Sequence, residues 1–82
     1  ELLGGDAFGD ASWETARRHL ERAVEIDPAT LIHRLELARI YLDVEEEALA
    51  REQLERILAL PSEEPTDPLH KREARELLDE IG

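Results

Sequence analysis

Residues 16–22 read Ala-Arg-Arg-His-Leu-Glu-Arg, and residues 50–56 read Ala-Arg-Glu-Gln-Leu-Glu-Arg. The two stretches share five of their seven residues and lie 34 positions apart in a chain of 82 residues. The same offset relates other apolar positions, for example Val24 and Leu58. A fixed period of this length indicates a repeated unit of supersecondary structure, so the repeat decides which fold we expect.

Apolar residues recur at helical spacing around and beyond each copy of the repeat. Ala, Leu, Glu and Arg, which are strong helix formers, dominate the composition, and this favours an all-α chain. We predict a helix remnant near 1–8 and helices near 12–26, 30–43, 45–60 and 67–81. Because the links between them are short, neighbouring helices should pack antiparallel.

Residues with particular backbone preferences mark the ends of these helices. Gly4, Gly5 and Gly9 should loosen the chain before residue 12. Pro28 cannot continue the helix that precedes it. The predicted starts are N-caps at Ser12 and Thr30, a capping box of Asp43 with Glu46, and an Asp67 cap ahead of Pro68.

The period of this repeat, with two helices in each unit, resembles that of the tetratricopeptide repeat (TPR). Leu3-Gly4 resembles the Leu-Gly pair in the first helix of that family's unit. The pattern of its second helix is matched by Trp13, Ala16, Leu20, Ala23 and Pro28. The matches in the second unit are Leu37, Ala38, Tyr41, Ala50 and Leu54.

The resemblance implies a TPR-like helical solenoid of antiparallel helix pairs with a C-terminal capping helix. We divide the chain into one and a half repeats over residues 1–61 and a proline-rich connector with a capping helix over 62–82. Within the first part, 1–28 is a partial repeat and 29–61 a full repeat. The order of repeat pair, Leu-Pro exit, proline-rich loop and final helix also resembles the end of small bacterial repeat proteins. Some of those are exported, and some resemble regulators of microtubule dynamics.

Charge and composition exclude several classes of partner and site. The formal net charge of −11 repels nucleic acid and anionic lipid, so we expect neither to bind. No stretch approaches the roughly 20 apolar residues of a membrane span, so we expect no membrane insertion. The absence of cysteine removes disulfides, thiolate nucleophiles and cysteine-based zinc sites.

We also expect no metal site, no cofactor and no catalytic residue. His19, His33 and His70 lie on different predicted helices, and none has a partner at ligand spacing. Carboxylates are plentiful, but nothing in the sequence marks one as a general acid or base in a cleft. The sequence therefore indicates that the chain is not an enzyme.

A binding groove is what the resemblance implies in place of an active site, because the first helix of each unit lines the inner surface in that family. Carried over by position, the groove residues are Ile32, Leu35, Glu36, Arg39 and Asp43. Arg39 would suit a carboxylate of the partner. The alternatives are that Leu35 packs against the capping helix and that Arg39 pairs with Glu36 or Asp43.

From these observations we expect a protein-interaction module that holds a peptide or helix of a protein partner. The alternative is a purely structural C-terminal cap, or a segment that self-associates as a homodimer through an exposed N-terminal flank. The chain begins with Glu1 rather than Met, which indicates that the natural N-terminus precedes it. Both a cytoplasmic and an exported location therefore stay open, as does the identity of the partner.

Overall fold

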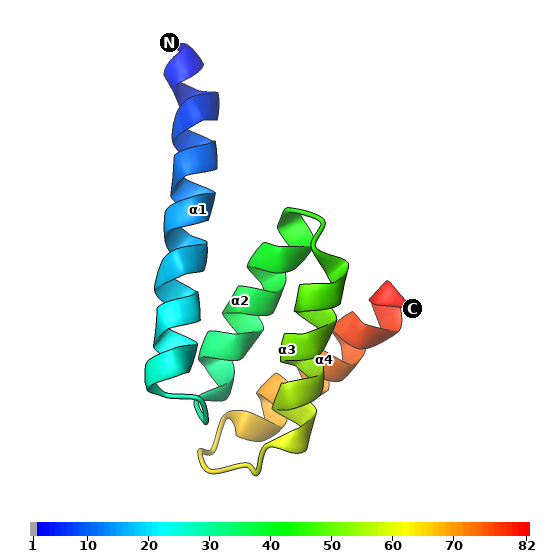
Figure 1. Ribbon diagram of the computed structural model, residues 1–82. Helices are drawn as coiled ribbons and strands as arrows, with labels where there is room; N and C mark the ends of the chain where they lie inside the picture. The colour runs from blue at the N-terminus through cyan, green and yellow to red at the C-terminus, as the bar shows by residue number, and fades with distance from the viewer. Residues whose placement is uncertain (1) are drawn as a thin grey trace.

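The computed structural model describes the backbone of residues 2–82 and the side chains of residues 13–82. That part of the chain contains four helices and no strand (Figure 1). The helices are α1 (Leu2–Ile26), α2 (Leu31–Asp43), α3 (Glu47–Ala59) and α4 (Asp67–Ile81). The expectation of an all-α chain is therefore confirmed.

The three C-terminal helices begin and end within two residues of the predicted bounds. The prediction for the N-terminal part is wrong, because the single helix α1 replaces the expected remnant near 1–8 and helix near 12–26. Glycine in a helix costs about 1 kcal/mol relative to alanine, but it keeps its amide donor. The backbone of α1 therefore continues through Gly4, Gly5 and Gly9, and Ser12 lies inside the helix and not at an N-cap.

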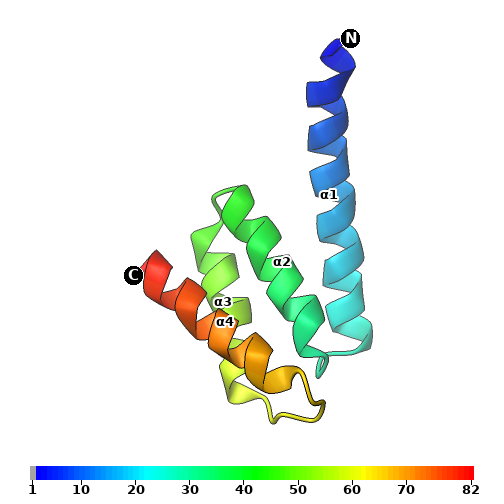
Figure 2. The same ribbon diagram turned by 180° about the vertical axis from the view of Figure 1, so that it is seen from behind.

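Helix α2 lies at the centre of the structure. The chain reverses direction from α1 to α2 and again from α2 to α3, and α4 then crosses the α2–α3 pair obliquely (Figures 1 and 2). Among the described elements, α2 contacts all three other helices, whereas α1 contacts α2 alone. The position of α1 therefore depends entirely on its contact with α2.

Nine buried apolar side chains form the core. They are Leu31, Leu35, Leu37, Ala38 and Tyr41 from α2, Ala50, Leu54 and Ile57 from α3, and Ala74 from α4. Helix α1 adds the partly buried Leu20 and Val24. Ala38 and Ala50 have no exposed surface, which lets the backbones of α2 and α3 approach closely while the larger residues fill the space around them.

Two polar side chains of α2 are buried with their hydrogen bonds made, as buried polar groups require. The Tyr41 hydroxyl donates to Glu21 Oε2 at 2.5 Å and joins α2 to α1. Burial and this neighbouring carboxylate raise the pKa of Tyr41. The Arg34 guanidinium donates to Pro28 O and to Gln53 Oε1, each at 2.9 Å. Burial lowers the pKa of Arg34.

The turn between α2 and α3 depends on a non-glycine residue with a positive φ. Glu45 has φ of 65°, its amide donates to Leu42 O at 3.1 Å, and the Glu46 amide donates to Tyr41 O at 2.7 Å. These two bonds define a Schellman motif. The predicted capping box is therefore wrong, because Asp43 still belongs to α2 and the N-cap residue of α3 is Glu46, without a side-chain capping bond.

Shortening Leu54 should destabilise the protein strongly, because its side chain is fully buried between the helices. We expect Leu54→Ala to lower the free energy of unfolding by about 2–5 kcal/mol. Leu69→Ala is the matched control, because Leu69 is 56% exposed and its loss should change stability by no more than about 0.5 kcal/mol. Urea denaturation followed by circular dichroism measures both, and equal losses would contradict this core.

Replacing Glu45 by glycine should stabilise the protein, because a left-handed backbone costs a non-glycine residue about 1–2 kcal/mol. Part of this gain is lost to the greater freedom of glycine in the unfolded chain, so we expect Glu45→Gly to raise the free energy of unfolding by about 0.5–1 kcal/mol. Glu47→Gly makes the same charge change in the first turn of α3 and should lower stability by a similar amount. Urea denaturation measures both variants, and we expect their changes in unfolding free energy to have opposite signs.

Candidate functional site

The structure does not gather the five predicted groove residues around one cleft. Leu35 is buried in the core, and Ile32 is half-buried at its edge. Glu36, Arg39 and Asp43 are exposed on α2. Ile32 and Asp43 lie near opposite ends of that helix, about 16 Å apart along its axis. A shared role of the five residues in binding a partner stays a prediction.

Arg39 forms an ion pair with Glu73 of α4. The sequence suggested Glu36 or Asp43 as its alternative partners, but those residues neighbour Arg39 only along α2. Glu73 is distant from Arg39 in the sequence and reaches it because α4 packs against α2. Both side chains of the pair are more than one-third exposed, so the pair contributes at most about 1 kcal/mol to stability.

The carboxylate of Asp67 fixes the proline-rich connector against the start of α4. Its Oδ2 accepts the backbone amides of Glu63 at 2.8 Å and Glu64 at 2.9 Å. These two bonds hold the pKa of Asp67 below its usual value. The sequence predicted Asp67 as the cap of this helix, but Thr66 is the N-cap residue, and the Asp67 side chain binds the connector instead.

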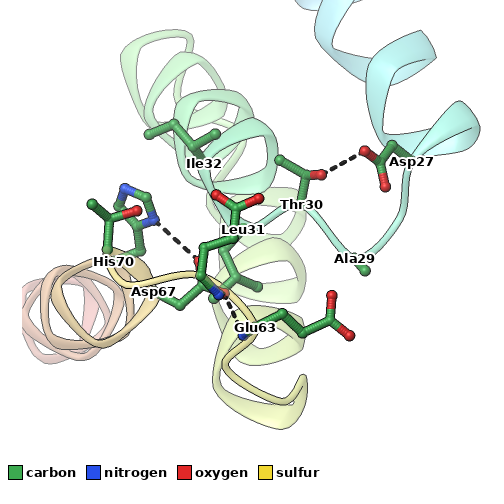
Figure 3. A pocket seen from close by; sticks show the side chains of 10 residues that line it. Asp27, Ala29, Thr30, Leu31, Ile32, Glu63, Asp67 and His70 are labelled. Atoms are coloured by element: carbon green, nitrogen blue, oxygen red, sulfur yellow. Dashed lines mark hydrogen bonds and ion pairs between the residues drawn. The ribbon is translucent and has the colours of Figure 1, made fainter.

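A cavity of about 400 Å³ opens beside this carboxylate, at the end of the molecule where the α1–α2 turn meets the connector (Figure 3). We call it the connector pocket. Its lining residues are Asp27, Ala29, Thr30, Leu31, Ile32, Glu63, Glu64, Thr66, Asp67 and His70. Of the five predicted groove residues, Ile32 alone lines this pocket.

One hydrogen bond holds a wall of the connector pocket. Thr30 occupies the N-cap position of α2, as the sequence predicted, but it makes no capping bond. Its hydroxyl instead donates to Asp27 Oδ2 at 2.6 Å. On the opposite wall, His70 Nδ1 lies 3.8 Å from Asp67 Oδ1, as Figure 3 shows.

The pocket has an excess of negative charge. Glu63 and Glu64 are exposed and form no ion pair with any described side chain. Asp27 accepts one neutral hydroxyl, so its charge is not compensated. Carboxylates in this state attract Lys and Arg side chains, which can bind two oxygens at once when the geometry allows. The excess of carboxylates makes the lining of the pocket electrostatically complementary to a cation.

The described histidines do not form a metal site. Over residues 13–82, no group of three His, Asp or Glu side chains is arranged to hold a metal ion. The Nδ1 atoms of His33 and His70 are buried and have no hydrogen-bond partner. They belong to separate helices, α2 and α4.

The connector pocket was not found from the sequence, although one signal pointed toward it. Glu63 and Glu64 stand in a short segment bounded by Pro61 and Pro68, and prolines on both sides restrict the conformations of such a segment. The sequence did not indicate that this segment folds back beside Asp27. Asp27 and the connector line one pocket because α4 packs against α2.

The fold and this surface together define the class of the protein: a small all-α unit with an acidic surface. A comparison with protein families then matches residues 3–82 to the family described as Regulator of microtubule dynamics protein 1-3. The match covers nearly the whole chain, so the chain belongs to this family.

The assignment to the tetratricopeptide repeat family is therefore wrong, because the matching family is a different one. The expected matches at Leu3 and Gly4 lie outside the described side chains. The second resemblance, to proteins like regulators of microtubule dynamics, agrees with the family match. The match does not support the bacterial origin that accompanied that resemblance.

Two further comparisons add nothing to this assignment. No curated protein and no solved structure matches the chain.

No helix among the described residues is long and apolar enough to cross a membrane.

The stabilising effect of Asp67 should disappear in acid. Because two amides lower its pKa in the folded state, its contribution is present above the unfolded pKa of about 3.9. It is lost as the pH falls through the lower, folded value. We expect the difference in unfolding free energy between wild type and Asp67→Ala to shrink between pH 5 and pH 2.

Asp79→Ala is the control for this measurement, because Asp79 is an exposed carboxylate of the same helix. Its stability relative to wild type should change little over the same pH range. Thermal unfolding in matched buffers measures all three proteins. A difference between wild type and Asp67→Ala that does not vary with pH would contradict the role given to the connector amides.

Proposed function

We propose that this chain is a protein-binding module that takes part in regulating microtubule dynamics and does not itself catalyse a reaction. The observation that carries the proposal is the family match over residues 3–82, which includes nearly all of the four helices. A protein-binding module acts through contact between its surface and a segment of its partner. We therefore look for its function in its exposed surface.

The connector pocket is the best candidate for that contact. A cavity of about 400 Å³ can take a long side chain or a short piece of peptide. Asp27, Glu63 and Glu64 give it uncompensated negative charge, and the net charge of −11 extends the attraction for a basic partner beyond the pocket. We propose a basic segment of a protein as its ligand.

The residues predicted on α2 divide between this surface and the scaffold beneath it. Glu36 and Asp43 are exposed carboxylates on α2, and we keep them as candidate contacts together with Ile32 in the pocket wall. Leu35 supports the surface from the core. Arg39 supports it by binding Glu73 of α4.

We also propose that the antiparallel helices form part of a helical solenoid, which the repeat in the sequence favours. A structural role is the second candidate function, because α4 covers α2 and α3 and fully buries Ala74. In that role the chain caps a longer solenoid or self-associates through its N-terminal flank, whose side chains lie outside those described. Light scattering over a range of concentrations separates a monomer from a self-associating chain.

The experiment that tests the proposed function measures single microtubules grown from purified tubulin in the presence of the chain. We expect the wild-type chain to change the growth or shortening rate in a saturable way. The variant Glu63→Gln/Glu64→Gln should need at least a tenfold higher concentration, because it removes two charges from the pocket. Rates that stay unchanged at high chain concentration would contradict the proposal.

Glu76→Gln/Glu80→Gln is the matched control, because it removes the same charge from exposed positions of α4 outside the pocket. It should act at the wild-type concentration. If both variants affected microtubules equally weakly, the effect would depend on the net charge of the chain and not on the pocket.

A further inference from the structure

A second concave surface lies away from the connector pocket, where α1 passes the end of α2. Trp13, Glu14 and Arg17 of α1 and Ile40 and Val44 at the end of α2 line a cavity of about 150 Å³. We call it the tryptophan notch. A cavity of similar volume in an engineered protein takes a benzene ring, so the notch has room for one apolar side chain.

The notch is open because α1 is much longer than α2. Helix α1 has 25 residues and α2 has 13, so α1 extends beyond the point where the chain turns into α3 (Figures 1 and 2). Trp13 is 44% exposed and Val44 is 41% exposed at this point. Two large apolar side chains thus stand together at the surface, with the buried Ile40 beneath them.

The chain is acidic on both sides of Val44. Asp43 ends α2, Glu45 and Glu46 lie in the turn, and Glu47 begins α3; all four are exposed, and we call them the acidic rim. None of the four forms an ion pair with a described side chain. On the other side, Arg17 is paired with Glu14 at 3.3 Å, so it does not offset the charge of the turn.

Because uncompensated carboxylates lie beside the apolar side chains of the notch, the charge of a ligand decides whether it binds there. A second copy of this chain carries the same net charge of −11 and would be repelled. An amphipathic helix places apolar side chains and Lys or Arg side chains on adjacent faces, so it can fill the notch and reach the rim together. The acidic rim and the apolar side chains of the notch are thus complementary to a basic amphipathic helix.

We propose that the tryptophan notch binds a basic amphipathic helix of a protein partner. One apolar side chain of that helix enters the notch between Trp13 and Val44, and its basic face lies against the acidic turn. This site is separate from the connector pocket and does not depend on ligand binding there.

Trp13 is the single tryptophan of the chain, so its fluorescence reports on the notch directly. The probe is a synthetic amphipathic helix of Leu, Ala and Lys without tryptophan, titrated into the 82-residue chain at low salt. We expect a saturable shift of the emission to shorter wavelength and affinity that falls as salt is added. No saturable shift up to millimolar peptide would overturn the proposal.

Two variants test the two parts of the notch. Val44→Ser removes apolar surface without a charge change and should weaken binding about tenfold. Glu45→Gln/Glu46→Gln/Glu47→Gln removes three rim charges and should also weaken binding at least tenfold. Circular dichroism confirms that each variant keeps its helices, and wild-type affinity in both folded variants would overturn the proposal.

Matched controls separate the notch from the rest of the acidic surface. Glu76→Gln/Asp79→Asn/Glu80→Gln makes the same charge change on α4, which does not contact α1, and should bind as the wild type does. A peptide with Glu in place of Lys should not bind.

Two other outcomes would point to a different site. A shift of the Trp13 emission caused by chain concentration alone would identify a second copy as the occupant. Loss of peptide binding in Glu63→Gln/Glu64→Gln but not in the rim variant would identify the connector pocket. Either result would overturn the proposal.

The microtubule experiment keeps this inference distinguishable from the proposed function. If the wild-type chain binds the peptide through the notch but leaves microtubules unchanged, the notch stands and the proposed function fails. If the chain alters microtubules but the notch variants bind the peptide as the wild type does, the proposed function stands and this inference fails.

Discussion

The burial of α2 between its three neighbours is the contact on which the rest of this structure depends. Five of the nine core side chains come from this helix, and α1 touches no other described helix. The apolar core supplies the stabilising free energy, while Tyr41 and Arg34 add polar contacts that fix the partners of α2 in one arrangement. Because α2 is enclosed, both concave surfaces form at its ends, where the chain must turn.

Each end of α2 combines a cavity with negative charge, but the two sites differ in character. The connector pocket is polar and is shaped by the Asp67 carboxylate, which holds two amides of the connector. The tryptophan notch is lined by three apolar side chains and the Glu14–Arg17 ion pair, and the further carboxylates near it are the exposed ones beside Val44. The net charge of −11 opposes association between copies of the chain and attracts positively charged groups to both sites.

Repeat-based reasoning predicted much of the fold but misassigned the family. The bounds of α2, α3 and α4 followed from apolar periodicity and from Pro28 and Pro68, which are strong local signals. The glycines near the N-terminus misled the prediction, because glycine lowers helix propensity without preventing a helix. The period of the repeat describes how helices are spaced, and chains of different families can share that spacing.

The sequence by itself determined the helical class, the positions of three helices and the acidic character of the chain, because these depend on local propensity and composition. The tertiary structure decided which residues meet. Arg39 forms an ion pair with Glu73, and Leu35 lies in the core. Asp27 and the connector line the same pocket. These contacts join residues that are far apart in the chain. They depend on the crossing angles of the packed helices, and those angles follow from side-chain packing across the whole core.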